Sequence, residues 1–134
     1  VHKMKKIMIF ICGEISKKCS ANGCFRTFND RLDAFGEYSE NEDLQLVAFN
    51  TCPGCNEGPV ENLKSKIEKI RKSGADTVHI STCIRGRCDN YEEFANILGE
   101  AEFNVIGYTH GSLGGKRENT VWIEDGEIRK FKKD

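Results

Sequence analysis

Residues 5–12 read KKIMIFIC, and the six positions from Ile7 to Cys12 are apolar without interruption. A strand of this kind is buried on both faces, as in a parallel sheet that helices cover on its two sides. The run is far too short to cross a bilayer. Gly13 and Glu14 follow it, in place of the small-residue cleavage site of a signal peptide. We therefore expect a soluble, cytoplasmic protein built around this strand.

Three further strands are expected at residues 44–49, 76–82 and 103–108, where short apolar segments recur. Segments with helical patterns separate them. Alternating strands and helices with short connections require right-handed crossovers, and these produce a mainly parallel sheet. The predicted fold is therefore α/β in three layers, with helices flanking a sheet of strand order 2-1-3-4.

The expected helices differ in the signals that define them. The first is indicated by a stripe with spacings of three and four, ending near Gly36, and its members are Phe25, Phe28, Leu32 and Phe35. The second begins at Pro59, which suits a first turn, and ends at Ser73 before a glycine. The third follows Asn90, which with Glu93 has the spacing of a capping box.

The remaining residues, 120–132, predict a β-hairpin that turns at Asp125-Gly126 and extends one edge of the sheet. A chain of 134 residues has the size of one domain, which we place at residues 4–134. The 20 Lys and Arg residues nearly balance the 21 Asp and Glu residues, and the formal net charge is -1. Overall charge therefore favours neither nucleic acid nor an anionic membrane as a partner.

Seven cysteines and one histidine fall after the predicted parallel strands, and so at one edge of the sheet. They are Cys12, Cys19, Cys24, Cys52, Cys55, Cys83, Cys88 and His110. In open α/β sheets, ligands bind outside the carboxyl ends of the strands, where the strand order reverses. An odd number of thiols leaves one over from a paired disulfide framework, which favours a reducing compartment. In such a compartment, clustered cysteines are usually metal ligands or redox catalysts.

The segment Cys52-Pro53-Gly54-Cys55 has the C-x-x-C spacing in which a tight turn brings two sulfurs to one metal ion. We expect Zn²⁺ to be bound, with Cys52, Cys55, Cys83 and Cys88 as core ligands. Cys19, Cys24 and His110 come next. Cys12 comes last, because a cysteine that ends an apolar strand can equally be an ordinary buried thiol.

Spacing leaves the chemistry open in three ways. Seven sulfurs and one imidazole could complete two tetrahedral zinc sites, or one four-cysteine site with spare ligands. Four of the cysteines could instead hold an iron–sulfur cluster. In the third alternative the protein is a thiol–disulfide oxidoreductase, with Cys52 or Cys55 as the attacking thiol. The motifs of nucleotide-binding or hydrolytic enzymes that would name a reaction are not evident.

Other charged and polar residues accompany the cysteines. Five basic side chains flank them and would offset the charge of several thiolates, namely Lys17, Lys18, Arg26, Arg85 and Arg87. His79 precedes Cys83 by four residues, about 13 Å along a strand, so it should not share a metal ion with that thiol. A structural or supporting role is expected for His79.

The sequence resembles the CGGC-domain family of prokaryotic proteins over roughly residues 4–110. The resemblance rests on Lys18-Cys19, Cys24, Phe28-Asn29, Cys52 to Cys55, His79 to Cys83, Cys88 and Thr109-His110. It implies a cysteine and histidine metal site, commonly taken to be for zinc, and it implies no known reaction. The family usually has two glycines between the paired cysteines. Here Pro53 stiffens that turn and removes one N–H donor.

Overall fold

The computed structural model describes residues 3–16, 19–38, 42–53, 57–110 and 120–131. One sheet has the strand order β2-β1-β3-β4-β5-β6. Four strands are parallel, β1 (Lys3–Ile11), β2 (Glu42–Thr51), β3 (Thr77–Ile80) and β4 (Asn104–Ile106). Two antiparallel strands, β5 (Thr120–Glu124) and β6 (Glu127–Phe131), complete one edge. The predicted order 2-1-3-4 and the C-terminal hairpin are both confirmed.

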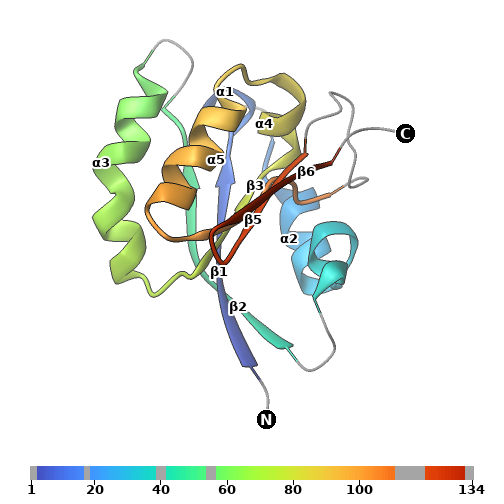
Figure 1. The fold of residues 1–134 in the computed structure, drawn as a ribbon. Coiled ribbons are helices and arrows are strands. Elements are labelled where there is room, and N and C mark those ends of the chain that lie inside the picture. Colours follow the sequence, from blue (N-terminus) through green and yellow to red (C-terminus); the bar gives the residue numbers. More distant parts are fainter. Residues whose placement is uncertain (1–2, 17–18, 39–41, 54–56, 111–119, 132–134) are drawn as a thin grey trace.

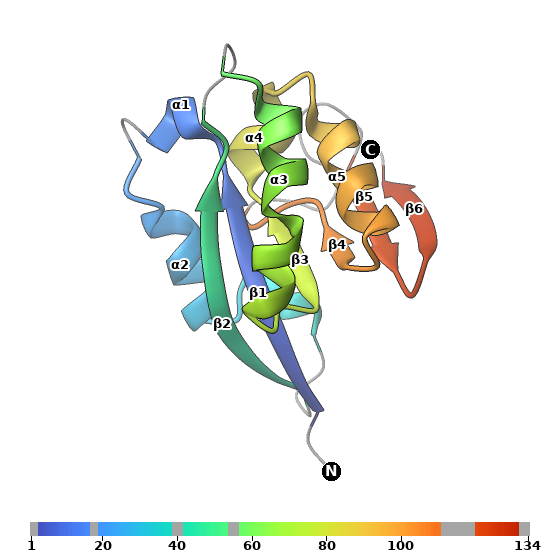
Figure 2. The ribbon, with the colours of Figure 1, turned by 90° about the vertical axis from the view of Figure 1, so that its left-hand side faces the viewer.

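Helices cover both faces of this sheet (Figures 1 and 2), which confirms the three-layer prediction. One face carries α3 (Pro59–Lys72) and α5 (Tyr91–Glu100), and the other carries α2 (Asn22–Asn29) and the 3₁₀ helix η1 (Asp33–Glu37). Two short helices follow the ends of β1 and β3, α1 (Gly13–Ser16) and α4 (Thr82–Arg87). Within the described part of the chain, no helix is long and apolar enough to cross a membrane.

β1 contributes to the core on both of its faces. Ile7, Ile9 and Ile11 belong to the cluster beneath α2 and η1. Met8 and Phe10 point to the opposite side and pack in the cluster beneath α3 and α5. Successive side chains of a strand point to opposite faces, so one unbroken apolar run supplies two layers at once. The expectation that this strand is buried on both sides is thus confirmed.

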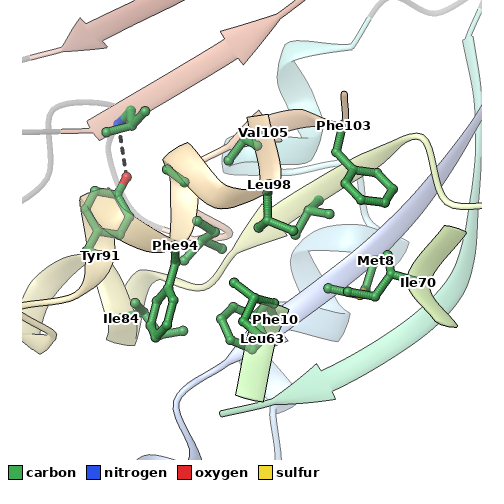
Figure 3. Packing of buried hydrophobic residues seen from close by; sticks show 14 of the residues in the cluster. Met8, Phe10, Leu63, Ile70, Ile84, Tyr91, Phe94, Leu98, Phe103 and Val105 are labelled. Carbon is green, nitrogen blue, oxygen red and sulfur yellow. Dashed lines mark hydrogen bonds between the residues drawn. The ribbon is translucent and has the colours of Figure 1, made fainter. Parts of the chain in front are cut away.

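The larger cluster joins β1 to both helices on its side of the sheet (Figure 3). The rings of Phe10 and Phe94 meet edge to face, with centroids 5.3 Å apart. Leu63 from α3 and Leu98 from α5 fill the space around them. Tyr91 lies at the end of this cluster. Its hydroxyl donates to the Gly107 carbonyl at 2.8 Å and accepts from the Val121 N–H at 3.0 Å, which ties β5 to α5.

The helix expected over residues 25–35 is divided in the structure, so that prediction is wrong in its extent. α2 ends at Asn29, and the chain turns through left-handed backbone at Arg31 and Asp33, with φ of 55° and 50°. The turn carries Leu32 out of the predicted apolar stripe and leaves its side chain 48% exposed. Phe35 still reaches the core, because η1 brings it back onto the sheet.

Two further expectations are corrected at α4 and α5. Residues 83–87, for which the sequence predicts neither a strand nor a helix, lie in α4, and Cys88 follows directly. α5 begins at Tyr91, and Asn90 makes no side-chain cap hydrogen bond, so the predicted capping box does not form. The hairpin turn is as expected, because Asp125 and Gly126 both have positive φ, at 51° and 83°.

Replacing Gly107 with alanine tests the packing around Tyr91. A Cβ atom at position 107 would lie 1.9 Å from the Tyr91 hydroxyl and 2.6 Å from the Val121 carbonyl oxygen. We expect Gly107→Ala to lower the free energy of unfolding by about 1–3 kcal/mol or more, the usual cost of overpacking. Urea denaturation would measure this.

Gly86→Ala is the matched control, because a Cβ atom there meets nothing within 4 Å. Position 86 lies inside α4. Alanine should therefore leave stability unchanged or raise it by up to about 1 kcal/mol. Equal stability of the two variants would contradict the packing described for Gly107.

Candidate functional site

The six predicted cysteines that the structure describes all lie in segments that follow the carboxyl ends of parallel strands, or in α2. Cys12 follows β1, Cys52 follows β2, and Cys83 and Cys88 lie in or directly after α4. Cys19 precedes α2, and Cys24 lies in its first turn. His110 follows β4. Cys55 falls outside the described residues.

The fold divides these thiols between the two faces of the sheet. Cys12 and Cys52 are buried in the cluster beneath α3 and α5, and Cys88 packs against that cluster. Cys24 is buried in the cluster beneath α2 and η1. Cys83 packs against both clusters. The cysteines thus form two groups, one on each face of the sheet, and Cys83 lies between the two groups.

The first group comprises Cys19, Cys24, Cys83 and His110, and we refer to it as the α2-side group. Burial raises the pKa of the Cys24 thiol, and the nearby Cys83 and Cys19 thiols raise it further, while the hydrogen bond from Thr109 lowers it. Cys83 packs against the cluster that contains Cys24, and the Cys19 sulfur accepts the N–H of Ala21, a member of that cluster, at 3.3 Å.

His110 belongs to the same group because its ring lies against the first turn of α2. A Cβ atom built on Gly23 would lie 3.4 Å from His110 Cδ2 and 3.7 Å from Nε2. Because Gly23 has no side chain, this imidazole has room to lie against the residue that precedes Cys24 in the chain. Three separate elements, α2, α4 and the segment after β4, bring the group together.

The second group lies on the other face of the sheet and comprises Cys12, Cys52 and Cys88, with Cys52 at its centre. The backbone N–H of Cys52 donates to the Ile11 carbonyl at 3.1 Å, which continues the pairing of β1 and β2. Its sulfur accepts the Gly13 N–H at 3.1 Å. A hydrogen bond from a backbone amide favours the charged form of a thiol. Because Cys55 lies outside the described residues, the turn between the two cysteines is not described.

The chemistry of the α2-side group fits a zinc ion, since cysteine sulfur and histidine nitrogen are the usual ligands of Zn²⁺. The positions of these side chains, in contrast to their chemistry, do not form a complete metal site. Among the residues that the structure describes, no three Cys, His, Asp or Glu side chains are arranged so that they could hold one metal ion. Coordination by this group therefore requires its side chains to draw closer together.

The charge around His110 suits a neutral imidazole. Partial burial lowers the pKa of His110, Asp33 raises it, and the positive charges of Arg85 and Arg26 lower it. Arg85 is itself buried. Its Nη1 donates to the Thr120 hydroxyl at 2.9 Å, and its guanidinium lies over the Tyr108 ring. Two of the five predicted basic residues thus act on the site.

The remaining three basic residues are not placed by the structure. Lys17 and Lys18 lie outside the described residues, and the side chain of Arg87 is not described. Their expected role in offsetting thiolate charge stays a prediction.

The described contacts of His79 are with aromatic residues and one backbone carbonyl, in keeping with the structural role expected for it. His79 is fully buried, its ring stacks on Phe35 at 4.2 Å, and both of its nitrogens are hydrogen bonded. Nδ1 lies 3.1 Å from the Tyr108 carbonyl oxygen, which can only accept, so this nitrogen carries the proton. Nε2 then accepts from the Tyr38 hydroxyl at 2.8 Å. These contacts give His79 a structural role.

Three hydroxyl groups at the site belong to residues that carry the family resemblance, but sequence reasoning assigned them no role. Ser81 Oγ lies 2.8 Å from Cys83 Sγ, and Thr109 Oγ1 lies 3.2 Å from Cys24 Sγ. Thr82 contacts the backbone of His110. The resemblance does not say what these hydroxyls contact, and only the fold brings residues 24, 82 and 109 together.

A cavity of about 180 Å³ lies at the opposite edge of the sheet. Its walls include Tyr38, Thr77 and Trp122, and no cysteine or histidine lines it. The α2-side group contributes nothing to this cavity, so we assign the candidate chemistry to the thiols and not to the cavity.

Comparison with known proteins gives a consistent result. The family model of the CGGC domain matches residues 6–110. An uncharacterized protein of Methanocaldococcus jannaschii is 28% identical to this chain over 116 residues, which cover 78% of this chain and 86% of the relative. No solved structure shows a significant match. The hairpin of β5 and β6 lies beyond the matched residues.

The buried His79 predicts a dependence of stability on pH. Burial lowers its pKa from 6.5 to about 3, partly opposed by the hydrogen bond to Tyr108. Below pH 6.5, His79 binds a proton in the unfolded chain but not in the folded chain. The contribution of His79 to the free energy of unfolding therefore falls as the pH falls from 6.5 toward 3, and it is constant above pH 6.5. Each pH unit in that window corresponds to about 1.4 kcal/mol.

His79→Gln separates this effect from the titration of the carboxylates, because glutamine offers one donor and one acceptor and does not titrate. At pH 5 the metal-free wild type should lose about 2 kcal/mol more of its pH 7 stability than the variant does. Urea unfolding at both pH values measures the difference. Parallel pH profiles for the two proteins would show that His79 is protonated in the folded state.

Proposed function

The chain belongs to the CGGC domain family, and on this premise we propose that it is a metal-binding protein that holds Zn²⁺ through thiolates and one imidazole. The observation that supports the proposal is the α2-side group, in which three thiols and one imidazole lie in neighbouring segments at the carboxyl edge of the sheet, although they are not close enough together to form a complete site. Both ligand types are ones that Zn²⁺ prefers.

Burial within this group suggests how a metal ion is taken up. Cys24 is buried, Cys83 and His110 are half-buried, and Cys19 is exposed. Because the thiol of Cys19 is exposed, we propose that an ion enters from its side and that Cys19 is the last ligand to bind. A bound Zn²⁺ would neutralise thiolate charge and join the segment before α2 to α4 and to the segment after β4.

We assign the remaining candidate ligands to a second set on the other face of the sheet. Cys52, Cys55 and Cys88 supply its sulfurs, with Cys12 as the fourth. Cys12 and Cys52 share one hydrophobic cluster, and Cys88 packs against it. Seven cysteines and one histidine then provide two sets of four donors, the number that a tetrahedral zinc site needs.

A thiol–disulfide oxidoreductase is the second candidate function. The amide of Gly13, 3.1 Å from Cys52 Sγ, favours a thiolate there, as an attacking cysteine requires. The burial of Cys52 weighs against it, because exchange needs access to the sulfur. No disulfide joins any two of the six cysteines that the structure describes, which suits a reducing compartment under either proposal.

Elemental analysis of protein purified without air and without chelator tests the first proposal. We expect stoichiometric zinc in a colourless sample, and Cys24→Ser and Cys83→Ser should each release the ion of the α2-side group. Cys12→Ser is the matched control and should retain that ion. His110→Gln should release it, whereas His79→Gln should not, because only the first imidazole lies at the site.

The other outcomes separate the alternatives. Iron with acid-labile sulfide would indicate a cluster protein. A metal-free protein with a reversible disulfide between Cys52 and Cys55 would indicate the oxidoreductase. Full zinc content in both Cys24→Ser and Cys83→Ser would contradict the ligand assignment.

A further inference from the structure

We propose that Thr82 and Thr109 are positioning residues of the α2-side group, and that their hydroxyls fix His110 and Cys24 relative to Cys83. The inference rests on the proposed function, and it adds two residues that bind no metal themselves. Its basis is a short network of hydrogen bonds between three elements that are far apart in the sequence.

The hydroxyl of Thr82 holds the backbone of His110 at both of its polar groups. It donates to the His110 carbonyl at 2.5 Å and accepts the His110 N–H at 3.0 Å. It also accepts the Thr109 N–H at 3.2 Å. A hydroxyl has one donor and two acceptor sites, so all three are used. Thr82 directly precedes Cys83 in α4, and the bonds therefore set the position of His110 relative to that thiol.

The hydroxyl of Thr109 continues the network to Cys24. It accepts the Thr82 N–H at 3.4 Å and lies 3.2 Å from Cys24 Sγ. Its 3.5 Å contact with the Thr82 hydroxyl cannot use its own proton, because the acceptor sites of Thr82 are already occupied. The Thr109 proton is therefore not used by Thr82 and can point at Cys24, and we infer that Thr109 is the donor when Cys24 is a thiolate.

The direction of this bond suits a metal-binding thiolate. A thiolate can only accept hydrogen bonds, and a hydroxyl that donates to it favours the charged form. Residues that hydrogen bond to metal ligands orient them, and their loss commonly weakens metal binding. The ring of His110 lies against Gly23, while Thr82 holds the backbone of His110 and Thr109 contacts Cys24.

Cobalt binding provides the test, because Co²⁺ occupies zinc sites and its absorption spectrum reports the number and geometry of its ligands. Thr109→Val keeps the shape of the side chain and removes the bond to Cys24. We expect this variant to bind Co²⁺ about 10- to 100-fold more weakly than wild type, with an altered ligand-field spectrum. Thr109→Ser retains the hydroxyl and should restore both the affinity and the spectrum.

Thr82→Val and Thr82→Ser repeat the comparison for the bonds to His110, with the same direction of effect. Should Thr82→Val fail to fold, Thr109→Val decides the question. Thr77→Val is the matched control, because Thr77 is a buried threonine at the opposite edge of the sheet, with its hydroxyl bonded to Asp76. This variant should bind Co²⁺ as wild type does.

The outcomes distinguish this inference from the proposed function. A wild-type protein that takes up neither Co²⁺ nor Zn²⁺ would overturn both. A wild-type protein that binds Co²⁺, with valine variants of the same affinity and spectrum, would overturn the role of the two threonines alone. Weak binding by Thr109→Ser and Thr77→Val as well would indicate a general loss of stability and would also overturn that role.

Discussion

The burial of β1 on both faces is the constraint on which the rest of the structure depends. A strand without a solvent-facing side needs helices above and below it and a paired strand on each edge. β2 and β3 provide the edges, both parallel to β1. Parallel neighbours require crossover connections, and every such connection leaves from the same edge of the sheet. The gathering of the cysteines is therefore a consequence of the fold.

The sheet could be predicted from the sequence because its signals are local. An apolar run, an alternating hairpin pattern and helical spacing each refer to neighbouring residues. The division of the helix near Arg31 and the formation of α4 depend on contacts across the molecule. A non-glycine residue in left-handed backbone carries no mark in the sequence. At Asn90 the opposite holds: the sequence has the pattern of a capping box, but the side chain makes no capping hydrogen bond.

The sequence could predict that the thiols lie beyond the strand ends, but it could not predict which of them lie near one another. Chain order alone puts the thiols beyond the strand ends. Their division follows from the alternation of side chains on β1, which sends Cys12 to one layer, and from α2, which brings Cys24 to the other. The C-x-x-C spacing drew attention to Cys52 and Cys55, whereas the fold packs Cys83 against the cluster that contains Cys24, 59 residues earlier. Such a pairing exists only once the chain has folded.

The place of Cys83 between the two hydrophobic clusters has a consequence for the lifetime of the protein. Its side chain packs against both layers, beside the hydroxyl of Ser81. Oxidation of a thiol to a sulfinic or sulfonic acid adds charged oxygens and is largely irreversible. At this position the new charge would lie against both hydrophobic clusters, so oxidation of one sulfur atom would destabilise the packing on both faces of the sheet. Exposure to oxidants would then limit how long a folded copy survives.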